Sequence, residues 1–207
     1  MQRKEPSCDT VSTSPNPDST DIIIRGIFHS HADVVRNVVA SKVPAIRSLC
    51  EQAVKIMKAG GKILLMGNGG SAADCQHIAA EFIGRFRTKR QALPAIALTT
   101  DTSTITALAN DFGYESVFER QIAALCQGND LVIGISTSGR SANILRGIAE
   151  ARRRNATTSA LLGRDGGPLE DIVDIPVTVD SMDTARIQEI HILIGHIVCE
   201  YCDECFQ

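Results

Sequence analysis

The spacing of hydrophobic residues divides the chain into two parts near residue 62. In residues 21–59 the apolar positions recur at intervals of three and four, which is the period of amphipathic helices. Pro44 is placed to begin a second helix, and the Gly60-Gly61 pair is placed to end it. This part of the chain therefore predicts two helices packed as a hairpin.

After residue 62 short, wholly apolar runs alternate with amphipathic segments. The apolar runs predict strands at 62–66, 95–100, 131–136, 158–163 and 175–179. The segments between them predict helices at 71–85, 103–125 and 140–154, followed by a long apolar helix from Asp183 to about Cys205. Apolar strands separated by helices are typical of a parallel sheet that is covered on both faces. We therefore predict an α/β fold in which a five-stranded parallel sheet is sandwiched by helices, with the helical hairpin before it and the long helix after it.

Composition sets the domain organisation and limits the classes of partner. Residues 1–20 are rich in Ser, Thr and Pro without periodicity, which predicts a disordered tail, and residues 21–207 predict a single domain. The formal net charge is −3, and no apolar run approaches the roughly 20 residues that span a bilayer. We expect no nucleic-acid or membrane partner. The polar N-terminus lacks the pattern of a signal peptide, so a cytoplasmic location is expected.

The seven cysteines are expected to be reduced thiols, because no export signal is evident. Three of them, Cys199, Cys202 and Cys205, stand at three-residue steps that could indicate a metal or redox site. The same steps describe one face of a terminal helix, and no second ligand cluster accompanies them. We favour the helix-face interpretation.

The first candidate site follows the first predicted strand. The sequence GNGGS, residues 67–71, leads from that strand into a helix, where backbone N–H groups, the helix dipole and the hydroxyl of Ser71 can bind an anion. His77 and Glu81 are four residues apart and share one face of this helix. Such a pair is usually a surface pair, but directly after a phosphate loop it becomes a candidate metal site or acid–base pair.

The second candidate site follows the third predicted strand, in ISTSGRSAN, residues 135–143. Four hydroxyl side chains lie around Gly139 just before a helix, namely Ser136, Thr137, Ser138 and Ser141. Helix N-capping would explain one or two of them but not four, whereas a phosphate needs many donors. In open parallel sheets ligands bind beyond the carboxyl ends of the strands, where both loops would lie. We therefore assign a phosphate to the second loop.

The sequence GNGGSA also loosely fits a dinucleotide-binding fingerprint. That fingerprint needs an acidic residue at the end of the next strand, about 20 residues later, and here the next strand comes later than that. The second loop also has no part in that fingerprint, so we do not favour nicotinamide binding. Arg85, Arg87, Lys89 and Arg90 form a basic run that is typical of solvated surface, although one of them could reach a substrate phosphate. His191 lies at a different angle on its helix from His196 and is expected either to pack in the interior or to support the residues that bind the ligand.

The combination of GNGGSA and STSGRSAN resembles the sugar isomerase (SIS) domain of phosphosugar-binding proteins. Three further motifs make the resemblance more specific: the H-x-x-x-E of His77 and Glu81, NDFGY at 110–114, and ARIQEIHILIGH at 185–196. With these the chain resembles the phosphoheptose isomerases over about residues 21–200. The resemblance implies a flavodoxin-like three-layer SIS fold and a homotetramer.

The resemblance also implies roles for individual residues. The sugar would be bound by Gly69, Gly70, Ser71, Asn110 and Asp111, with further contacts from Glu81 and Gln188. The phosphate would be bound by Ser136, Thr137, Ser138 and Ser141. One zinc ion per subunit would be coordinated by His77, Glu81, Gln188 and His196. Some members carry Asp where this chain has Ala185, which leaves that carboxylate's role unfilled unless Asp183 supplies it.

The chemistry expected of such a site is aldose–ketose isomerisation through an enediol. Glu81 is suited to remove the carbon-bound proton, His196 to move protons between oxygens, and zinc to polarise the carbonyl. The expected reaction converts sedoheptulose 7-phosphate to D-glycero-D-manno-heptose 7-phosphate, for nucleotide-activated heptoses of lipopolysaccharide or other surface glycans. Alternatives are a non-catalytic SIS protein like the DnaA-associating relatives, which lack a carboxylate at the position of Glu81, or action on another phosphosugar.

Helix geometry constrains the predicted metal site. Gln188 and His196 are eight residues apart, which places them about 12 Å apart along a helix axis. Either both side chains lean toward one ion, or two subunits each supply some of the ligands. We therefore expect a homo-oligomer with the site at or near a subunit interface.

Overall fold

The computed structural model describes residues 17–207. A disordered tail was predicted for residues 1–20, and residues 1–16 of it lie outside the described residues. The predicted boundary at residue 20 is wrong. Residues 17–20 form the first turn of the helix α1, Pro17–Ser41. Pro17 and Asp18 both suit a helix N-terminus, since proline needs no hydrogen bond there and the carboxylate opposes the positive end of the helix dipole.

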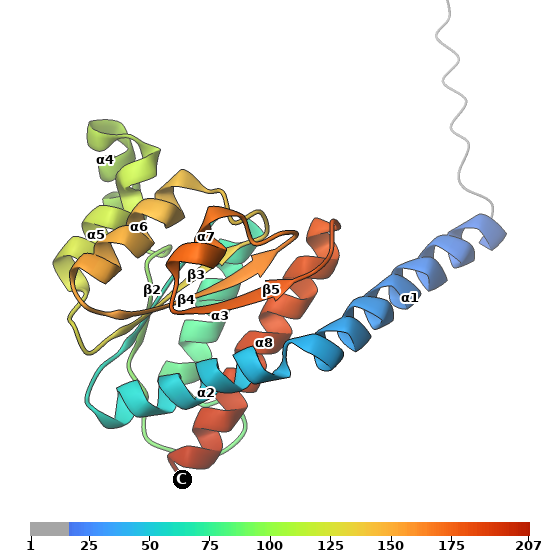
Figure 1. Cartoon of the computed structure of the whole chain (residues 1–207), viewed down its shortest axis with the longest axis horizontal. Helices are drawn as coiled ribbons and strands as arrows, with labels where there is room; N and C mark the ends of the chain where they lie inside the picture. Colours follow the sequence, from blue (N-terminus) through green and yellow to red (C-terminus); the bar gives the residue numbers. More distant parts are fainter. Residues whose placement is uncertain (1–16) are drawn as a thin grey trace, which may run out of the picture.

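A parallel sheet of five strands forms the centre of the fold, in the order β2-β1-β3-β4-β5 (Figure 1). The strands are β1 (Ile63–Gly67), β2 (Ala95–Ala97), β3 (Leu131–Ser136), β4 (Thr157–Gly163) and β5 (Ile175–Val179). All five predicted strands and their parallel arrangement are confirmed. The order reverses direction between β1 and β3, and Gly67 at the end of β1 is paired with Ile135 of β3. The two predicted loops therefore leave the sheet side by side, at the place where open α/β sheets bind ligands.

Alternate residues along each strand pack into two separate hydrophobic cores. Leu65 and Ile133 face one core with the helices α2 (Val43–Lys58), α3 (Gly70–Ile83) and α8 (Thr184–Cys205). Leu64 and Val132 face the other, with α5 (Val117–Leu125) and α6 (Ala142–Arg153). A strand whose successive side chains point to opposite faces, both covered by helices, is apolar at most positions. This explains why the strand segments are continuous hydrophobic runs.

Two helical predictions need correction on this half of the chain. The helix predicted at 103–125 is divided into α4 (Thr102–Phe112), a short 3-10 turn at Tyr114–Ser116, and α5. The division occurs at Gly113, whose φ of 83° lies outside the helical region. A further short helix, α7 (Gly167–Ile172), was not predicted, because six residues are too few to display a helical period.

The predicted N-terminal hairpin is also wrong. α1 and α2 are separated by Lys42 alone, and α1 runs out from the body of the molecule in continuation of α2 (Figure 1). Helical hydrogen bonds cross the junction, from the N–H of Lys42 to the carbonyl of Val38 (2.8 Å) and from the N–H of Ile46 to the carbonyl of Lys42 (3.0 Å). A reversal needs a loop, and one residue does not provide it. Pro44 interrupts one hydrogen bond and so bends the helix without reversing it.

The helix α8 is fixed at both ends and in the middle. Asp183 caps its N-terminus by accepting a hydrogen bond from the N–H of Ala185 (2.9 Å), which gives this carboxylate a structural role. His191 is fully buried, and its Nε2 lies 2.9 Å from the carbonyl oxygen of Leu162 on β4. Burial lowers the pKa of His191 to about 4. His191 is therefore an interior packing residue, as predicted.

The cysteines at the end of α8 lie as the helix-face interpretation predicted. Cys199 and Cys202 are fully buried on the face that packs against α2 and α3, and Cys205 is half-buried. Burial raises the pKa of Cys202 to about 12, so this thiol stays protonated at neutral pH. Within residues 17–207, no helix is long and apolar enough to cross a membrane.

The lowered pKa of His191 predicts a specific dependence of stability on pH. Below pH 6.5 the unfolded chain binds a proton on this imidazole that the folded chain does not bind until about pH 4, so stability falls as pH falls through this window. Between pH 7 and pH 5 the wild type should lose about 2 kcal/mol more unfolding free energy than His191→Gln, at about 1.4 kcal/mol per pH unit. Urea unfolding at the two pH values measures this. Equal losses in the two proteins would show that His191 has the same pKa in the folded and unfolded chains, which would contradict the prediction.

Candidate active site

The second loop brings two of its four hydroxyl side chains together, those of Ser136 and Ser141. Ser136 ends β3 and is almost fully buried, and its Oγ accepts a hydrogen bond from the N–H of Gly139 (3.1 Å) and lies 3.4 Å from the Oγ of Ser141. Gly139 has a φ of +64°, and a Cβ there would lie 1.7 Å from the carbonyl oxygen of Gly166. The tight turn therefore requires glycine, and it places Ser136 and Ser141 together at the N-terminus of α6, as expected for an anion site.

A pair of asparagines joins the two loops, and the sequence analysis missed it. Asn68 Nδ2 donates to Asn143 Oδ1 (3.0 Å), and Asn143 Nδ2 donates back to Asn68 Oδ1 (2.9 Å). The hydroxyl of Tyr114 also donates to Asn68 Oδ1 (3.0 Å). The signal for this pair was present, because each loop carries one Asn beside its glycines or serines. The two amides fix the distance between the first loop and the second loop.

A cavity of about 170 Å³ opens beside the first loop. Its walls are formed by loop residues, by α4 and α5 and by the turn between them, namely Gly67, Asn68, Gly69, Ala72, Thr99, Ile105, Tyr114, Val117 and Phe118. The predicted sugar ligands Asn110 and Asp111 are not among these residues. They are exposed on α4, where Asn110 Nδ2 donates to Asp111 Oδ1 (2.8 Å).

The two predicted histidine ligands meet between α3 and α8. His77 Nε2 lies 2.9 Å from His196 Nε2, and 3.5 Å from Glu81 Oε1. Burial and the neighbouring His77 both lower the pKa of His196, and the charge of Glu81 opposes them in part. A neutral His196 ring has a lone pair that can accept a proton or bind a metal. The ring of Phe86 stacks on it, with centroids 5.1 Å apart and an interplanar angle of 23°.

This arrangement suits a zinc ion in part. Two nitrogens each about 2.0–2.1 Å from zinc lie about 3.3 Å apart in tetrahedral geometry, which is close to the separation of the two imidazoles. Residues 17–207 contain no preformed group of three or more His, Cys, Asp or Glu ligands, so Glu81 would have to turn toward the imidazoles to complete a donor set. Two imidazoles and a carboxylate are ligands that zinc accepts.

The fourth predicted ligand lies elsewhere in the chain. A Cβ added to Gly70 would lie 2.8 Å from Gln188 Nε2, so the amide of Gln188 packs against the start of α3. His77 is seven residues further along that helix, which is about 10 Å along the axis. Gln188 is thus beside the first loop and apart from His77, Glu81 and His196 within one chain.

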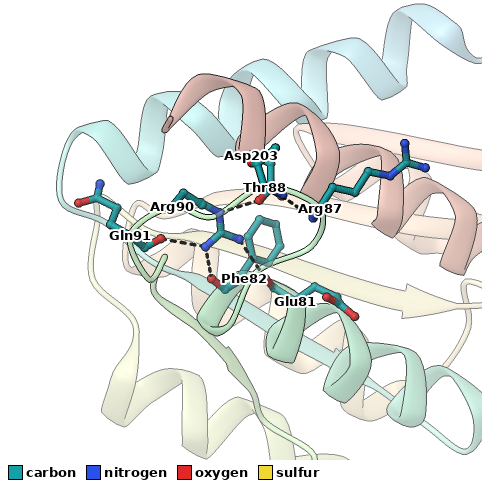
Figure 2. Close-up of polar contacts among 7 residues, drawn as sticks. All are labelled: Glu81, Phe82, Arg87, Thr88, Arg90, Gln91 and Asp203. Atoms are coloured by element: carbon teal, nitrogen blue, oxygen red, sulfur yellow. Dashed lines mark hydrogen bonds and ion pairs between the residues drawn. The ribbon is translucent and has the colours of Figure 1, made fainter.

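The basic run after α3 is only partly solvated. Arg85, Arg87 and Lys89 are exposed, as predicted, but the side chain of Arg90 is fully buried, with its Nε 2.6 Å from Asp203 Oδ1. Figure 2 shows Arg90 between α8 and the end of α3, where it donates to backbone carbonyls. The prediction failed for Arg90 because its partner lies on α8, 113 residues later.

Comparison with known proteins agrees with this fold. Residues 28–163 match the model of the SIS domain family. The phosphoheptose isomerase of Geobacter metallireducens is 53% identical over 86% of this chain and 94% of its own length. That of Roseiflexus is 51% identical over 90% of this chain and 94% of its own.

Solved structures give the same result. The phosphoheptose isomerase of Neisseria gonorrhoeae superposes with a TM-score of 0.85 and 39% identity, covering 89% of this chain and 99% of that one. The Francisella tularensis enzyme superposes with a TM-score of 0.86 and 38% identity, covering 90% and 98%. The fold and the two strand-end loops are those of an SIS-domain phosphosugar-binding protein. Within that class, this chain belongs to the phosphoheptose isomerase family.

Proposed function

We propose that the protein is an aldose–ketose isomerase that converts sedoheptulose 7-phosphate to D-glycero-D-manno-heptose 7-phosphate. The observation that carries this proposal is the meeting of His77, Glu81 and His196 between α3, the helix that follows the first loop, and α8. Relatives named phosphoheptose isomerase match at 51–53% identity over nearly their whole length. A non-catalytic SIS protein, including a DnaA-associating one, would not require a carboxylate at Glu81, so its presence favours catalysis.

The substrate extends from the second loop toward the α3–α8 contact. Its phosphate is bound by the hydroxyls of Ser136, Thr137, Ser138 and Ser141 and by the amides at the start of α6. The sugar lies along the first loop, which contributes Gly69, Gly70 and Ser71 near Gln188. Asn110 and Asp111 are exposed on α4, from which they can reach sugar hydroxyls at the open end of the site.

The reaction requires proton transfers at two carbons and two oxygens. The carboxylate of Glu81 removes a proton from C1 of the open-chain ketose, which gives an enediol or enediolate across C1 and C2, and a proton is then returned to C2. His196 moves a proton between the oxygens on C1 and C2. Burial and the neighbouring His77 lower its pKa, which favours the neutral imidazole needed for proton transfer.

We further propose one zinc ion per subunit, held by His77, Glu81 and His196, with Gln188 as a fourth donor. When bound, zinc supplies a Lewis acid that polarises the carbonyl oxygen. Since Gln188 lies beside Gly70, it either extends toward the ion or belongs to the site of a neighbouring subunit.

The proposed assembly is a homotetramer with the site at or near a subunit interface. An apolar groove of about 300 Å³ runs between α1, α2 and α8, and Leu193 and Ile197 form an exposed stripe beside His196. The outer half of α1 carries exposed Ile22 and Phe28 (71% and 70%). Apolar surface of this extent favours burial against other copies of the chain. Synthesis of a heptose phosphate from a sugar phosphate favours a cytoplasmic location.

The activity is tested by incubating purified protein with sedoheptulose 7-phosphate and measuring the aldose formed. Wild type should turn over, and Glu81→Gln should lose at least about 100-fold in kcat, because the amide cannot accept the carbon proton. Glu119→Gln on α5 is the matched control and should keep wild-type kcat.

Absence of turnover by wild type rejects the isomerase proposal, and full activity of Glu81→Gln rejects this carboxylate as the base. Activity that survives thorough metal removal rejects a catalytic role for zinc.

The assembly is tested by light scattering after size-exclusion chromatography. Wild type should have four times the mass of one chain, and Leu193→Glu should shift to smaller species, because it places a charge in an apolar interface. Leu125 lies on α5 in the opposite layer and is as exposed in one chain as Leu193. The control variant Leu125→Glu should therefore remain tetrameric. A monomeric wild type, or a Leu193→Glu tetramer, contradicts the proposed interface.

A further inference from the structure

One buried ion pair holds the segment that follows α3, residues 84–94, against α8. The guanidinium of Arg90 uses several donors at once: Nε to Asp203 Oδ1 (2.6 Å), Nη1 to the carbonyls of Phe82 (2.8 Å) and Gln91 (2.9 Å), and Nη2 to the carbonyl of Glu81 (2.9 Å). The last carbonyls of a helix have no partners within it. Arg90 satisfies two of these in α3 and places a positive charge at the negative end of its dipole (Figure 2).

Asp203 completes the arrangement from the other side. Its Oδ2 accepts hydrogen bonds from the N–H groups of Arg87 (2.7 Å) and Thr88 (2.9 Å), while Oδ1 pairs with Arg90. The side chains of Arg90 and Asp203 are 0% and 1% exposed. A buried carboxylate with three donors is a geometrically specific contact, and such contacts fix one conformation of the segments that they join. Here they join residues 87–90, the end of α3 and the last turns of α8.

Both proton-transfer residues are attached to this arrangement. Arg90 binds the backbone carbonyl of Glu81 directly. The segment that Asp203 holds by the N–H groups of Arg87 and Thr88 also carries Phe86, whose ring stacks on the imidazole of His196. Arg87 extends back over Phe86, with its Cζ 5.6 Å from the ring centroid. A displacement of this segment would therefore move the backbone of Glu81. It would also remove the stacking contact that fixes the orientation of the His196 ring.

We propose that the Arg90–Asp203 pair is a positioning unit that sets Glu81 and His196 relative to each other for proton transfer and metal binding. This inference rests on the proposed isomerase function. Arg90 and Asp203 touch no substrate in this arrangement, and they act through the carbonyl of Glu81 and the ring of Phe86. A misplacement of about 1 Å in such a pair can cost on the order of 100-fold in rate.

A second ion pair provides a matched control. Asp130 is also 1% exposed, lies 2.6 Å from Lys62 Nζ, and accepts hydrogen bonds from the N–H groups of Lys62 (3.0 Å) and Gln127 (2.7 Å). It lies just before β3, at the N-terminal ends of the strands, whereas the two loops follow their C-terminal ends. Asp130→Asn therefore removes a comparable buried carboxylate without a contact to the site.

The experiment compares Asp203→Asn, Asp130→Asn and Phe86→Leu with wild type in three measurements. These are urea unfolding, kcat and KM for sedoheptulose 7-phosphate, and zinc affinity by competition with a chromophoric chelator. Both Asn variants should be destabilised, because each leaves buried donors without a carboxylate. Asp203→Asn alone should lose at least about 10-fold in kcat and bind zinc at least about 10-fold more weakly, with KM within about threefold. Phe86→Leu, which leaves the ion pair intact, should show smaller losses of the same two quantities.

The outcomes separate positioning from simple stabilisation. The proposal is overturned if Asp203→Asn keeps the kcat and zinc affinity of wild type while it loses as much stability as Asp130→Asn. Equal catalytic losses in the two Asn variants overturn it as well. If Asp203→Asn does not fold, wild-type kcat and zinc affinity in Phe86→Leu reject the link to His196. If wild type has no turnover, the proposed function fails by itself, and zinc affinity alone then decides whether the pair positions the two side chains.

Discussion

The close parallel packing of α3 against α8 is the contact on which the site depends. Gly195 faces Ile78, and a Cβ at Gly195 would lie 2.4 Å from Ile78 Cδ1. Because glycine has no side chain, the two helices approach closely at this level and bring together His77 and His196, which are 119 residues apart in sequence. The same packing holds Gln188 against the start of α3 and Asp203 against its end. One helix pair thus aligns the first loop, the imidazoles and the buried ion pair in order along its length.

The proposed reaction has a second requirement, a binding place for the phosphate at a fixed distance from the reacting carbons, and the sheet is arranged to supply it. The reversal of strand order between β1 and β3 sets the two loops side by side, and the reciprocal amides of Asn68 and Asn143 hold them together. Rigid attachment of a remote phosphate allows its binding energy to orient the reacting part of a substrate. The Ser136–Ser141 turn is built for this, since its hydroxyls and amides are already ordered by their own hydrogen bonds.

Local features of the fold could be predicted from sequence, and contacts between distant segments could not. The strands were identifiable because residues such as Leu64 and Leu65 are apolar at successive positions, and α3 because Gly-rich turns precede helices. The hairpin was wrong because hydrophobic spacing reports helical faces and says nothing of the angle between α1 and α2. In the site, hydroxyl density identified Ser136 and Ser141, and the resemblance to a family supplied His196. The partner of Arg90 is a lone Asp on a distant helix, for which no local pattern exists.

The central claim is that the α3–α8 contact creates a metal-binding, proton-transferring centre from His77, Glu81 and His196. Zinc K-edge X-ray absorption on the protein loaded with one equivalent of zinc tests it most directly. The account predicts a first shell of nitrogen and oxygen at about 2.0–2.1 Å, with the outer-shell scattering of two imidazoles, and loss of one imidazole in His196→Gln. Sulfur scattering at about 2.3 Å would instead place the metal at the cysteines of α8 and would contradict the account.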